Sequence, residues 1–181
     1  MKLTFAILIS LILSSVCFAQ LNEVPKQNIP KEYGYIVKQG DKMPDLVLEL
    51  TDGTKITTSD LKGKVVMLQF TASWCSVCRK EMPHIEKDIW QKHKKNENFA
   101  LFGVDMDEPV DKVKKFAKDM NISYPLALDP GAKIFYTFAA PKAGVTRNII
   151  IDKDGKIAYM TRLFKEDEFN EMKEVIDFLL K

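Results

Sequence analysis

The stretch "VVMLQFTASWCSVCRKEMP", residues 65–83, decides the fold. Its first six residues are apolar except Gln69, which is typical of a strand buried on both faces in a sheet covered by helices. After the two cysteines, Cys75 and Cys78, apolar residues recur at helical spacing and predict a helix to about residue 94. The cysteine pair is therefore expected where a buried strand leads into a helix.

This position favours thiol chemistry at Cys75. The N-terminus of a helix has unpaired backbone N–H groups and about half a positive charge, so a thiolate there is stabilised and its pKa falls below the free value of roughly 8.5. Cys78 is one helical turn later, on nearly the same side. We predict that Cys75 attacks a substrate disulfide and that Cys78 resolves the mixed disulfide. A purely structural bridge between them would close a very short loop and would constrain the unfolded chain little.

The regions around the motif alternate between strand and helix patterns, and a hairpin and a last helix follow. This order predicts an α/β sandwich with a mixed sheet over residues 41–181. The segments are the strands "DLVLEL" and "NFALFGVDMD", the helix "EPVDKVKKFAKDMN", the hairpin "RNIIIDKDGKIAYMTRL" and the closing helix "EDEFNEMKEVIDFLLK".

The first 19 residues are predicted to be a signal peptide. Lys2 precedes an apolar run over residues 3–13, and small residues allow cleavage after Ala19. Lipidation at Cys17 and an uncleaved signal anchor are the alternatives, although the apolar run is short for a membrane span. Residues 20–40 mix Pro, Gly, Asn and Lys, and are expected to form a flexible or loosely packed arm.

Composition narrows the partners. Lys and Arg number 27, Asp and Glu 25, and the net charge of +2 indicates neither a nucleic-acid partner nor an anionic membrane surface. Of three cysteines, two remain after the predicted cleavage, and an exported protein is free to form a disulfide from them. We expect a monomer with no cofactor and no bound metal.

The segment "FTASWCSVCRKEMP" resembles the active site of the thioredoxin superfamily, and especially the exported TlpA/ResA-like thiol–disulfide oxidoreductases with their pattern W-C-x-x-C-x-x-E-x-P. Trp74, Cys75, Cys78, Glu81 and Pro83 match it. The similarity continues through "FGVDMDEPVDKVKKFAKDMNISYPLALD" to "IIIDKDGKI". It implies a thioredoxin-like three-layer sandwich with an N-terminal extension and a βα insertion, a proton-transfer role for Glu81, and a Trp74 side chain that covers the sulfurs.

One position departs from the family pattern. The family places a cis-proline opposite the sulfurs, and counting back from Asp152 puts Thr146 there, while the nearest proline is Pro141. We expect Thr146 to take the proline's place and to line the substrate site, and a loop shift that brings Pro141 closer to the sulfurs is the alternative. Its peptide bond is expected to be trans, because a cis bond before a non-proline residue costs about 2.5–4 kcal/mol. Arg147 is interpreted as an exposed loop residue, with a role beside the thiolate as the alternative.

Two other functions are compatible with the motif. Two thiolates can hold a soft ion such as Cu(I), so a copper carrier is one alternative, and a peroxiredoxin-like peroxidase is another. The resemblance itself implies protein disulfides as substrates and a membrane-bound thiol reductant as electron donor. It places the protein in the periplasm and includes the cysteines of apocytochromes awaiting haem among the substrates, as in cytochrome c maturation. The direction of electron flow stays open.

Overall fold

The computed structural model describes residues 22–181. The predicted signal peptide, its cleavage after Ala19 and the alternative lipidation at Cys17 lie outside this range. No helix within the described range combines the length and the apolar character needed to cross a bilayer.

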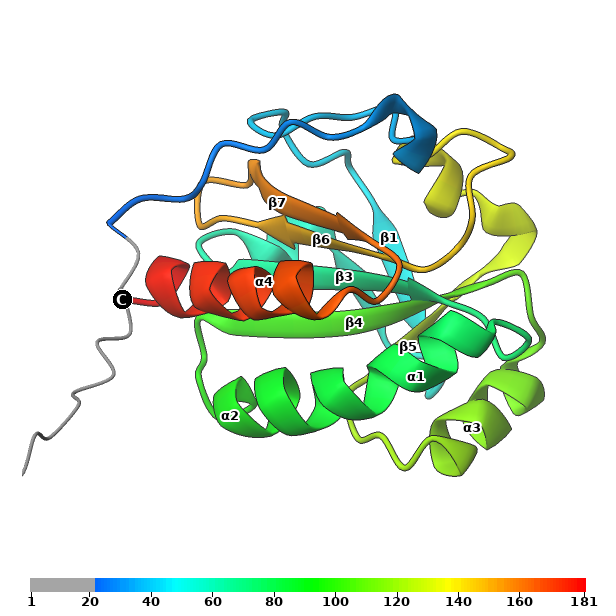
Figure 1. Ribbon diagram of the computed structural model, residues 1–181. Coiled ribbons are helices and arrows are strands. Elements are labelled where there is room, and N and C mark those ends of the chain that lie inside the picture. The colour runs from blue at the N-terminus through cyan, green and yellow to red at the C-terminus, as the bar shows by residue number, and fades with distance from the viewer. Residues whose placement is uncertain (1–21) are drawn as a thin grey trace, which may run out of the picture.

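One mixed sheet of seven strands organises residues 22–181, in the order β2-β1-β5-β4-β3-β6-β7 (Figure 1). The parallel strands β3, β4 and β5 form its centre, and β6, β7, β1 and β2 extend it by antiparallel pairing. This arrangement confirms the predicted α/β fold with a mixed sheet. The strands are β1 (Val47–Leu50), β2 (Lys55–Thr57), β3 (Val65–Thr71), β4 (Phe99–Met106), β5 (Leu126–Asp129), β6 (Arg147–Ile151) and β7 (Ile157–Arg162).

Strand β3 is buried along its whole length, as its apolar sequence predicted. Gln69 on β3 pairs with Asn148 on β6, and Phe70 pairs with Arg147. Because successive side chains of a strand point to opposite faces, these two cross-strand pairs belong to opposite sides of the sheet. One side of the sheet thus receives two amides, and the other receives an aromatic ring and a guanidinium group.

The helix after β3 is not continuous. It consists of α1 (Ser76–His84), a π-helical segment (Ile85–Trp90) and the short α2 (Gln91–His93). Pro83 lies inside α1, where it lacks the N–H that would continue the regular hydrogen bonding, and the π-helical segment begins two residues later. The predicted helical extent, to about residue 94, is therefore correct, and the helix changes type just after Pro83.

The amide side of the sheet is covered by helices. In Figure 1, α1 and α4 (Glu166–Leu179) both lie in front of the strands. The ring of His84 at the end of α1 meets that of Phe169 in α4 edge to face, and Arg79 of α1 lies over the ring of Phe116 in α3 (Val110–Asp119). Helix α1 therefore packs between its two neighbours.

The other side of the sheet is covered by aromatic residues from the segment before β6. The rings of Phe135 and Phe138 each lie 5.6 Å from that of Phe70. Short 3-10 turns carry this segment and others; they span Lys31–Tyr33, Thr58–Leu61, Pro130–Ala132 and Phe135–Thr137.

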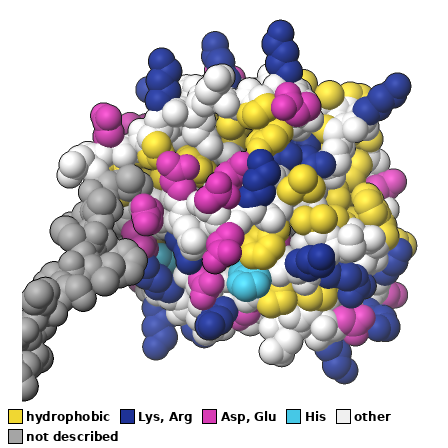
Figure 2. Space-filling model, in the orientation of Figure 1, with side chains coloured by type: hydrophobic (Ala, Val, Ile, Leu, Met, Phe, Trp, Pro, Cys, Tyr) yellow, Lys and Arg dark blue, Asp and Glu magenta, His cyan; other side chains and the backbone are white. Residues whose placement is uncertain are grey.

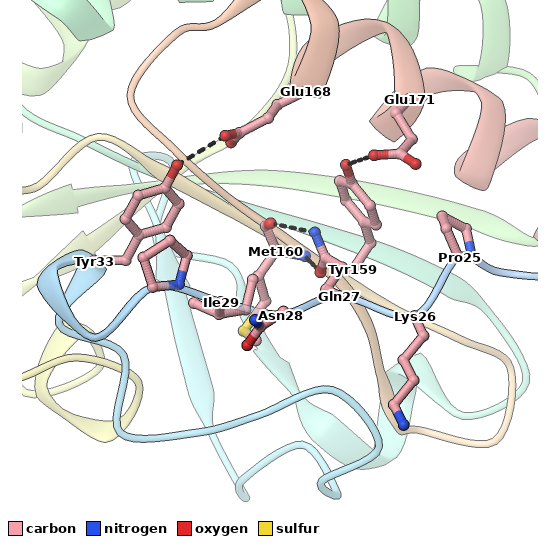
Figure 3. A pocket seen from close by; sticks show the side chains of 11 residues that line it. Pro25, Lys26, Gln27, Asn28, Ile29, Tyr33, Tyr159, Met160, Glu168 and Glu171 are labelled. Carbon is pink, nitrogen blue, oxygen red and sulfur yellow. Dashed lines mark hydrogen bonds between the residues drawn. The ribbon is translucent and has the colours of Figure 1, made fainter.

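The arm predicted for residues 20–40 was expected to be flexible or loosely packed, but its described part is held against β7 (Figure 3). The Gln27 side chain bonds to both backbone groups of Met160, accepting from its N–H at 2.7 Å and donating to its carbonyl at 2.9 Å. Gln39 donates to the carbonyls of Pro25 and Ala158, both at 2.8 Å. The Gln27 and Gln39 side chains therefore bond to backbone groups of β7 in the way that a neighbouring strand would.

Tyrosine side chains complete this contact. Tyr33 donates to Glu168, and Tyr159 donates to Glu171, so the arm and β7 are both linked to α4 (Figure 3). The sequence pattern did not reveal these contacts, because each joins residues that are far apart in the chain or depends on the local path of the arm.

Candidate active site

Cys75 lies at the N-cap of α1, where the sequence placed it. Its Sγ accepts the backbone N–H of Cys78 at 3.2 Å, and it is 8% exposed. The helix therefore directs unpaired N–H groups and the positive end of its dipole at this sulfur. Cys75 thus keeps a small exposed area and lies where negative charge is stabilised.

Cys78 lies beneath Cys75 and is fully buried. The two sulfurs are not joined to each other here. The neighbouring Cys78 thiol, the Thr146 hydroxyl and the backbone N–H groups of Cys78 and Val77 hold the pKa of Cys75 well below its usual value, against the opposing effect of burial. The Cys75 sulfur and burial together raise the pKa of Cys78. The two sulfurs thus divide into a thiolate and a thiol.

Thr146 lies directly beside both sulfurs. Its Oγ1 is 3.0 Å from Cys75 Sγ and 3.2 Å from Cys78 Sγ, and the residue is buried. No peptide bond within residues 22–181 is cis, which confirms the trans bond predicted at Thr146. The position opposite the sulfurs is therefore occupied by a hydroxyl group.

Glu81 is buried one turn below Cys78, on the amide side of the sheet. Its Oε1 accepts the Asn148 amide at 2.7 Å, whereas its Oε2 has no hydrogen-bond partner among the described residues. Burial raises the pKa of Glu81 to about 7, although the amides of Asn148 and Gln69 act to lower it. This carboxyl group can therefore take up or release a proton near neutral pH.

Gln69, the one polar residue in the first part of β3, is a buried amide in the core. Its Oε1 accepts the Tyr124 hydroxyl at 2.7 Å. Its Nε2 makes no hydrogen bond of regular geometry within the described part of the chain, but the amide is near enough to Glu81 to act on the pKa of that carboxyl group. Gly103, opposite Gln69 on β4, leaves room for this pair, since a Cβ there would lie 3.2 Å from the Tyr124 ring and 2.3 Å from Leu126.

Trp74 and Arg147 differ from each other in exposure. The Trp74 side chain is 63% exposed beside the dithiol, where the motif placed it. Arg147 was interpreted as an exposed loop residue, and this interpretation is wrong, because it is fully buried on β6. Its guanidinium lies 4.4 Å from the centre of the Tyr35 ring and donates to the carbonyls of Tyr33 and Gly144. The alternation of the strand directs it to the face opposite Glu81.

The sequence analysis missed Asn148, which holds Glu81. Its Nδ2 also donates to Thr161 Oγ1 at 2.9 Å, while its Oδ1 is unpartnered within residues 22–181. A polar residue at the start of the apolar run "NIIID" carries the same signal that identified Gln69 in "VVMLQF". A search of both strands for a polar residue within an apolar run would have identified Gln69 and Asn148 together.

A pair of carboxyl groups, Asp105 and Glu108, lies near the loop that precedes Cys75. Glu108 accepts from both the backbone N–H and the hydroxyl of Ser73, at 2.6 and 2.7 Å, and pairs with Lys112. Asp105, at the end of β4, is fully buried, and burial together with Glu108 raises its pKa to about 8. Glu108 thus fixes the loop that presents Trp74 and Cys75. Within residues 22–181, no group of three or more His, Cys, Asp or Glu side chains is placed to hold a metal ion.

Comparisons with known proteins agree with this geometry. The sequence profile of the Redoxin family matches residues 38–176. The chain is 31% identical to the thiol-disulfide oxidoreductase ResA of Bacillus cereus (strain ATCC 10987 / NRS 248), over 99% of this chain and 95% of that protein. A second ResA, from Bacillus anthracis, is 36% identical over 65% of this chain and 66% of the relative.

Solved structures share the fold. A solution structure of a candidate protein disulfide isomerase from Bacteroides thetaiotaomicron has a TM-score of 0.79 and 58% identity, and covers 81% of this chain and 92% of that one. A candidate thiol:disulfide interchange protein DsbE from Chlorobium tepidum has a TM-score of 0.69 and 27% identity, over 80% of this chain and 99% of its own. With Cys75 and Cys78 at the start of α1, the chain belongs to the Redoxin family as a thioredoxin-like thiol–disulfide oxidoreductase.

Proposed function

We propose that this protein reduces protein disulfides outside the cytoplasm, with Cys75 as the attacking sulfur and Cys78 as the resolving sulfur. The difference in access between the two sulfurs carries the proposal. Cys75 is 8% exposed at the helix N-terminus, whereas Cys78 is fully buried beneath it. An incoming disulfide can therefore be reached by Cys75 first, and Cys78 can act afterwards on the bond that Cys75 has formed.

The reaction proceeds in two exchanges. The Cys75 thiolate attacks one substrate sulfur, and the other substrate sulfur leaves as a thiolate. Cys78 then loses its proton and attacks Cys75 Sγ, which releases the second substrate sulfur and leaves a Cys75–Cys78 disulfide. The low pKa of Cys75 favours the first attack, and the raised pKa of Cys78 requires a proton acceptor for the second.

Glu81 is the proposed acceptor. A general base works best when its pKa lies near the working pH, and burial gives Glu81 a pKa of about 7. Its unpartnered Oε2 leaves one oxygen available for a proton. Asn148 holds the other oxygen and thereby fixes the carboxyl group in place.

Trp74 and Thr146 are proposed to line the path of the substrate. Hydrophobic side chains gather in the right-hand part of Figure 2, on the side of the molecule where α1 begins in Figure 1. Trp74 and Leu163 are exposed, and the Leu163 backbone lies against Thr146. Exposed apolar residues around a reactive thiolate suit a protein substrate better than a small charged disulfide.

Export and the electron supply are inferred by resemblance to the TlpA/ResA-like proteins. We infer that residues 1–19 direct export to the periplasm, that a membrane-bound thiol reductant restores the dithiol, and that apocytochrome cysteines in cytochrome c maturation are among the substrates. N-terminal sequencing of the protein from cell envelopes tests export, with Gln20 expected as the first residue. An N-terminus at Met1 contradicts cleavage, and a lipid-modified Cys17 supports the lipoprotein alternative.

Two cysteine variants test the assignment of roles. Cys75→Ser should abolish the reduction of insulin disulfides, because no accessible sulfur remains. Cys78→Ser should attack normally and then accumulate a mixed disulfide, which non-reducing gels and mass spectrometry detect. If Cys75→Ser keeps full activity, the proposal is wrong. The trapped partners of Cys78→Ser in cell envelopes would identify both substrates and the electron donor.

The reduction potential of the pair decides the direction of electron flow. A value near about −270 mV, that of thioredoxin, supports a reductant, whereas one near about −120 mV, that of DsbA, indicates an oxidant. Equilibration of the purified protein with glutathione or dithiothreitol buffers, followed by thiol counting, gives this value.

A further inference from the structure

The Thr146 hydroxyl is shared by the two reacting sulfurs. Its oxygen lies 3.0 Å from Cys75 Sγ and 3.2 Å from Cys78 Sγ, and all three residues are buried. A hydroxyl group has one hydrogen to donate and two lone pairs to accept with. It can therefore donate to a thiolate on one side while it accepts the S–H of the thiol on the other.

The backbone around this hydroxyl is fixed from several directions. The Thr146 carbonyl accepts the Leu163 N–H and the Arg162 guanidinium, each at 3.1 Å. The buried Arg147 guanidinium donates to the Gly144 carbonyl at 2.8 Å and ties the preceding turn to the arm at Tyr33. With the backbone held in this way, the hydroxyl oxygen stays beside both sulfurs while its hydrogen is free to rotate between them.

We propose that Thr146 is a catalytic residue whose hydroxyl stabilises the negative charge on each sulfur in turn. Before the first exchange, it donates to the Cys75 thiolate and accepts from the Cys78 S–H. After Cys75 has joined the substrate, its sulfur carries no charge, and the hydroxyl hydrogen turns toward Cys78 as that thiolate forms. This inference rests on the proposed roles of Cys75 and Cys78.

The atoms and electrons balance without a further reactant. Before the reaction, the protein has one thiolate and one thiol, and the substrate has one disulfide. Afterwards the protein has the Cys75–Cys78 bond, and the substrate sulfurs, reduced by two electrons, have become one thiol and one thiolate. The proton on the substrate thiol is the one that Cys78 lost, and Glu81 can carry it in between. Thr146 donates hydrogen bonds throughout and keeps its own proton.

Two substitutions separate the hydroxyl from the shape of the side chain. Thr146→Val keeps the branched shape and removes the hydroxyl, whereas Thr146→Ser keeps the hydroxyl. Neither changes the other charged groups near the pair, Glu81 and Arg162, so a shift in the Cys75 pKa is attributable to the hydroxyl. Hydrogen bonds to charged groups are strong enough that losing one should raise the pKa of Cys75 by about 1 to 2 in the Val variant. In Thr146→Ser, the pKa of Cys75 should stay close to that of the natural protein.

Ultraviolet absorbance of the thiolate and the pH dependence of alkylation at Cys75 give this pKa. A second measurement is the rate at which the preformed mixed disulfide releases its substrate thiol, which should fall about tenfold or more in Thr146→Val. The reduction potential should also fall, by about 30 mV for each tenfold loss of thiolate stability. Thr146→Ala, checked by circular dichroism, repeats the test if the Val variant does not fold.

This inference is overturned if folded Thr146→Val or Thr146→Ala has the same Cys75 pKa and the same release rate as the natural protein. The same result leaves the proposed function intact if the natural protein still reduces insulin. Conversely, failure of the natural protein to reduce any disulfide overturns the proposed function, whatever the pKa of Cys75 in the variants.

Discussion

The arm on β7 and the polar side chains beneath the dithiol use the same kinds of groups in opposite ways. On the arm, the amide of Gln27 bonds through both its oxygen and its nitrogen, and the amide of Gln39 does so as well. Beneath the dithiol, Gln69 and Asn148 each have one amide atom without a hydrogen-bond partner within the described residues. One oxygen of the Glu81 carboxyl group is likewise without a partner there.

This difference indicates what each region is for. Buried polar groups are nearly always hydrogen-bonded, because an unpaired one costs about 1–3 kcal/mol. The arm follows that rule, as a structural contact should. The unpaired atoms beneath the dithiol cost stability, and they gather around the carboxyl group that is proposed to move a proton. Such local violations are expected where chemistry takes place.

The largest expected effect comes from removing the charge at Glu81. Burial places its pKa at about 7 in the folded protein, above the ordinary value of 4.5. Between pH 4.5 and about pH 7, the unfolded chain has released a proton that the folded protein retains. The free energy of unfolding of the natural protein therefore declines as pH rises through this window and is constant above it. The glutamine of Glu81→Gln does not ionise, so this variant should not show the decline in the free energy of unfolding, which approaches about 3 kcal/mol in the natural protein.

Urea unfolding of the natural protein and Glu81→Gln at a series of pH values between 4 and 8 measures this. Their stability difference should change in favour of the variant as pH rises, while disulfide reduction by the variant becomes slower. A difference that stays constant with pH would mean that Glu81 does not titrate in this range.

Asn148→Ala sharpens the comparison by removing the amide that holds Glu81. Both Glu81 and Thr161 lose a hydrogen bond, so we expect a loss of about 1–3 kcal/mol. The pKa of Glu81 should rise further, because the Asn148 amide acts to lower it. The pH profile of insulin reduction should shift upward accordingly.

Thr161→Val is the matched control for Asn148→Ala. It removes one partner of Asn148 and leaves the bond from Asn148 to Glu81, so the pH profile should stay in place. If Thr161→Val shifts the pH profile as much as Asn148→Ala does, the shift comes from a general disturbance of the packing around Asn148 and not from the loss of its amide.

The arm should respond in stability alone. Gln27→Ala removes the bonds to both backbone groups of Met160 and should cost about 1–2 kcal/mol in urea unfolding. The reduction potential and the Cys75 pKa should not change. Lys26→Ala, at an exposed neighbour, should be close to neutral. A change in the potential of Gln27→Ala would show that the two regions are coupled.

The smallest effect on stability is expected at Trp74. Because its side chain is 63% exposed, Trp74→Ala should change the free energy of unfolding by less than about 0.5 kcal/mol. It should nevertheless slow the reduction of insulin more than that of a small disulfide, since the indole is proposed to contact protein substrates. Equal slowing of both reactions would assign Trp74 to the chemistry of the sulfurs instead.

The sequence predicted well what depends on local pattern. The buried strand before Cys75, the helix after it and the low pKa of Cys75 all follow from spacing and from the properties of helix ends. The family pattern added Glu81 and drew attention to Thr146, where proline is missing. These features need information from neighbouring residues or from a motif, and a single chain supplies both.

Contacts between distant segments could not be predicted in the same way. Arg147 is at the start of a strand, and its burial depends on rings from Tyr35 and Phe135 that the fold brings to it. The composition of the arm is that of a loose segment, yet its glutamines match the backbone of β7. In each case the partner lies too far along the chain for a local pattern to reveal it.

The arm has a further consequence, for the assembly of the sheet. A bare outer strand offers its backbone groups to other chains and invites edge-to-edge aggregation. Gln27 and Gln39 occupy such groups on β7, so this border cannot readily accept a strand from a second molecule. The opposite border is β2, which is three residues long and carries Lys55. A short, charged strand is a poor template, and both ends of the sheet are thus protected against uncontrolled growth.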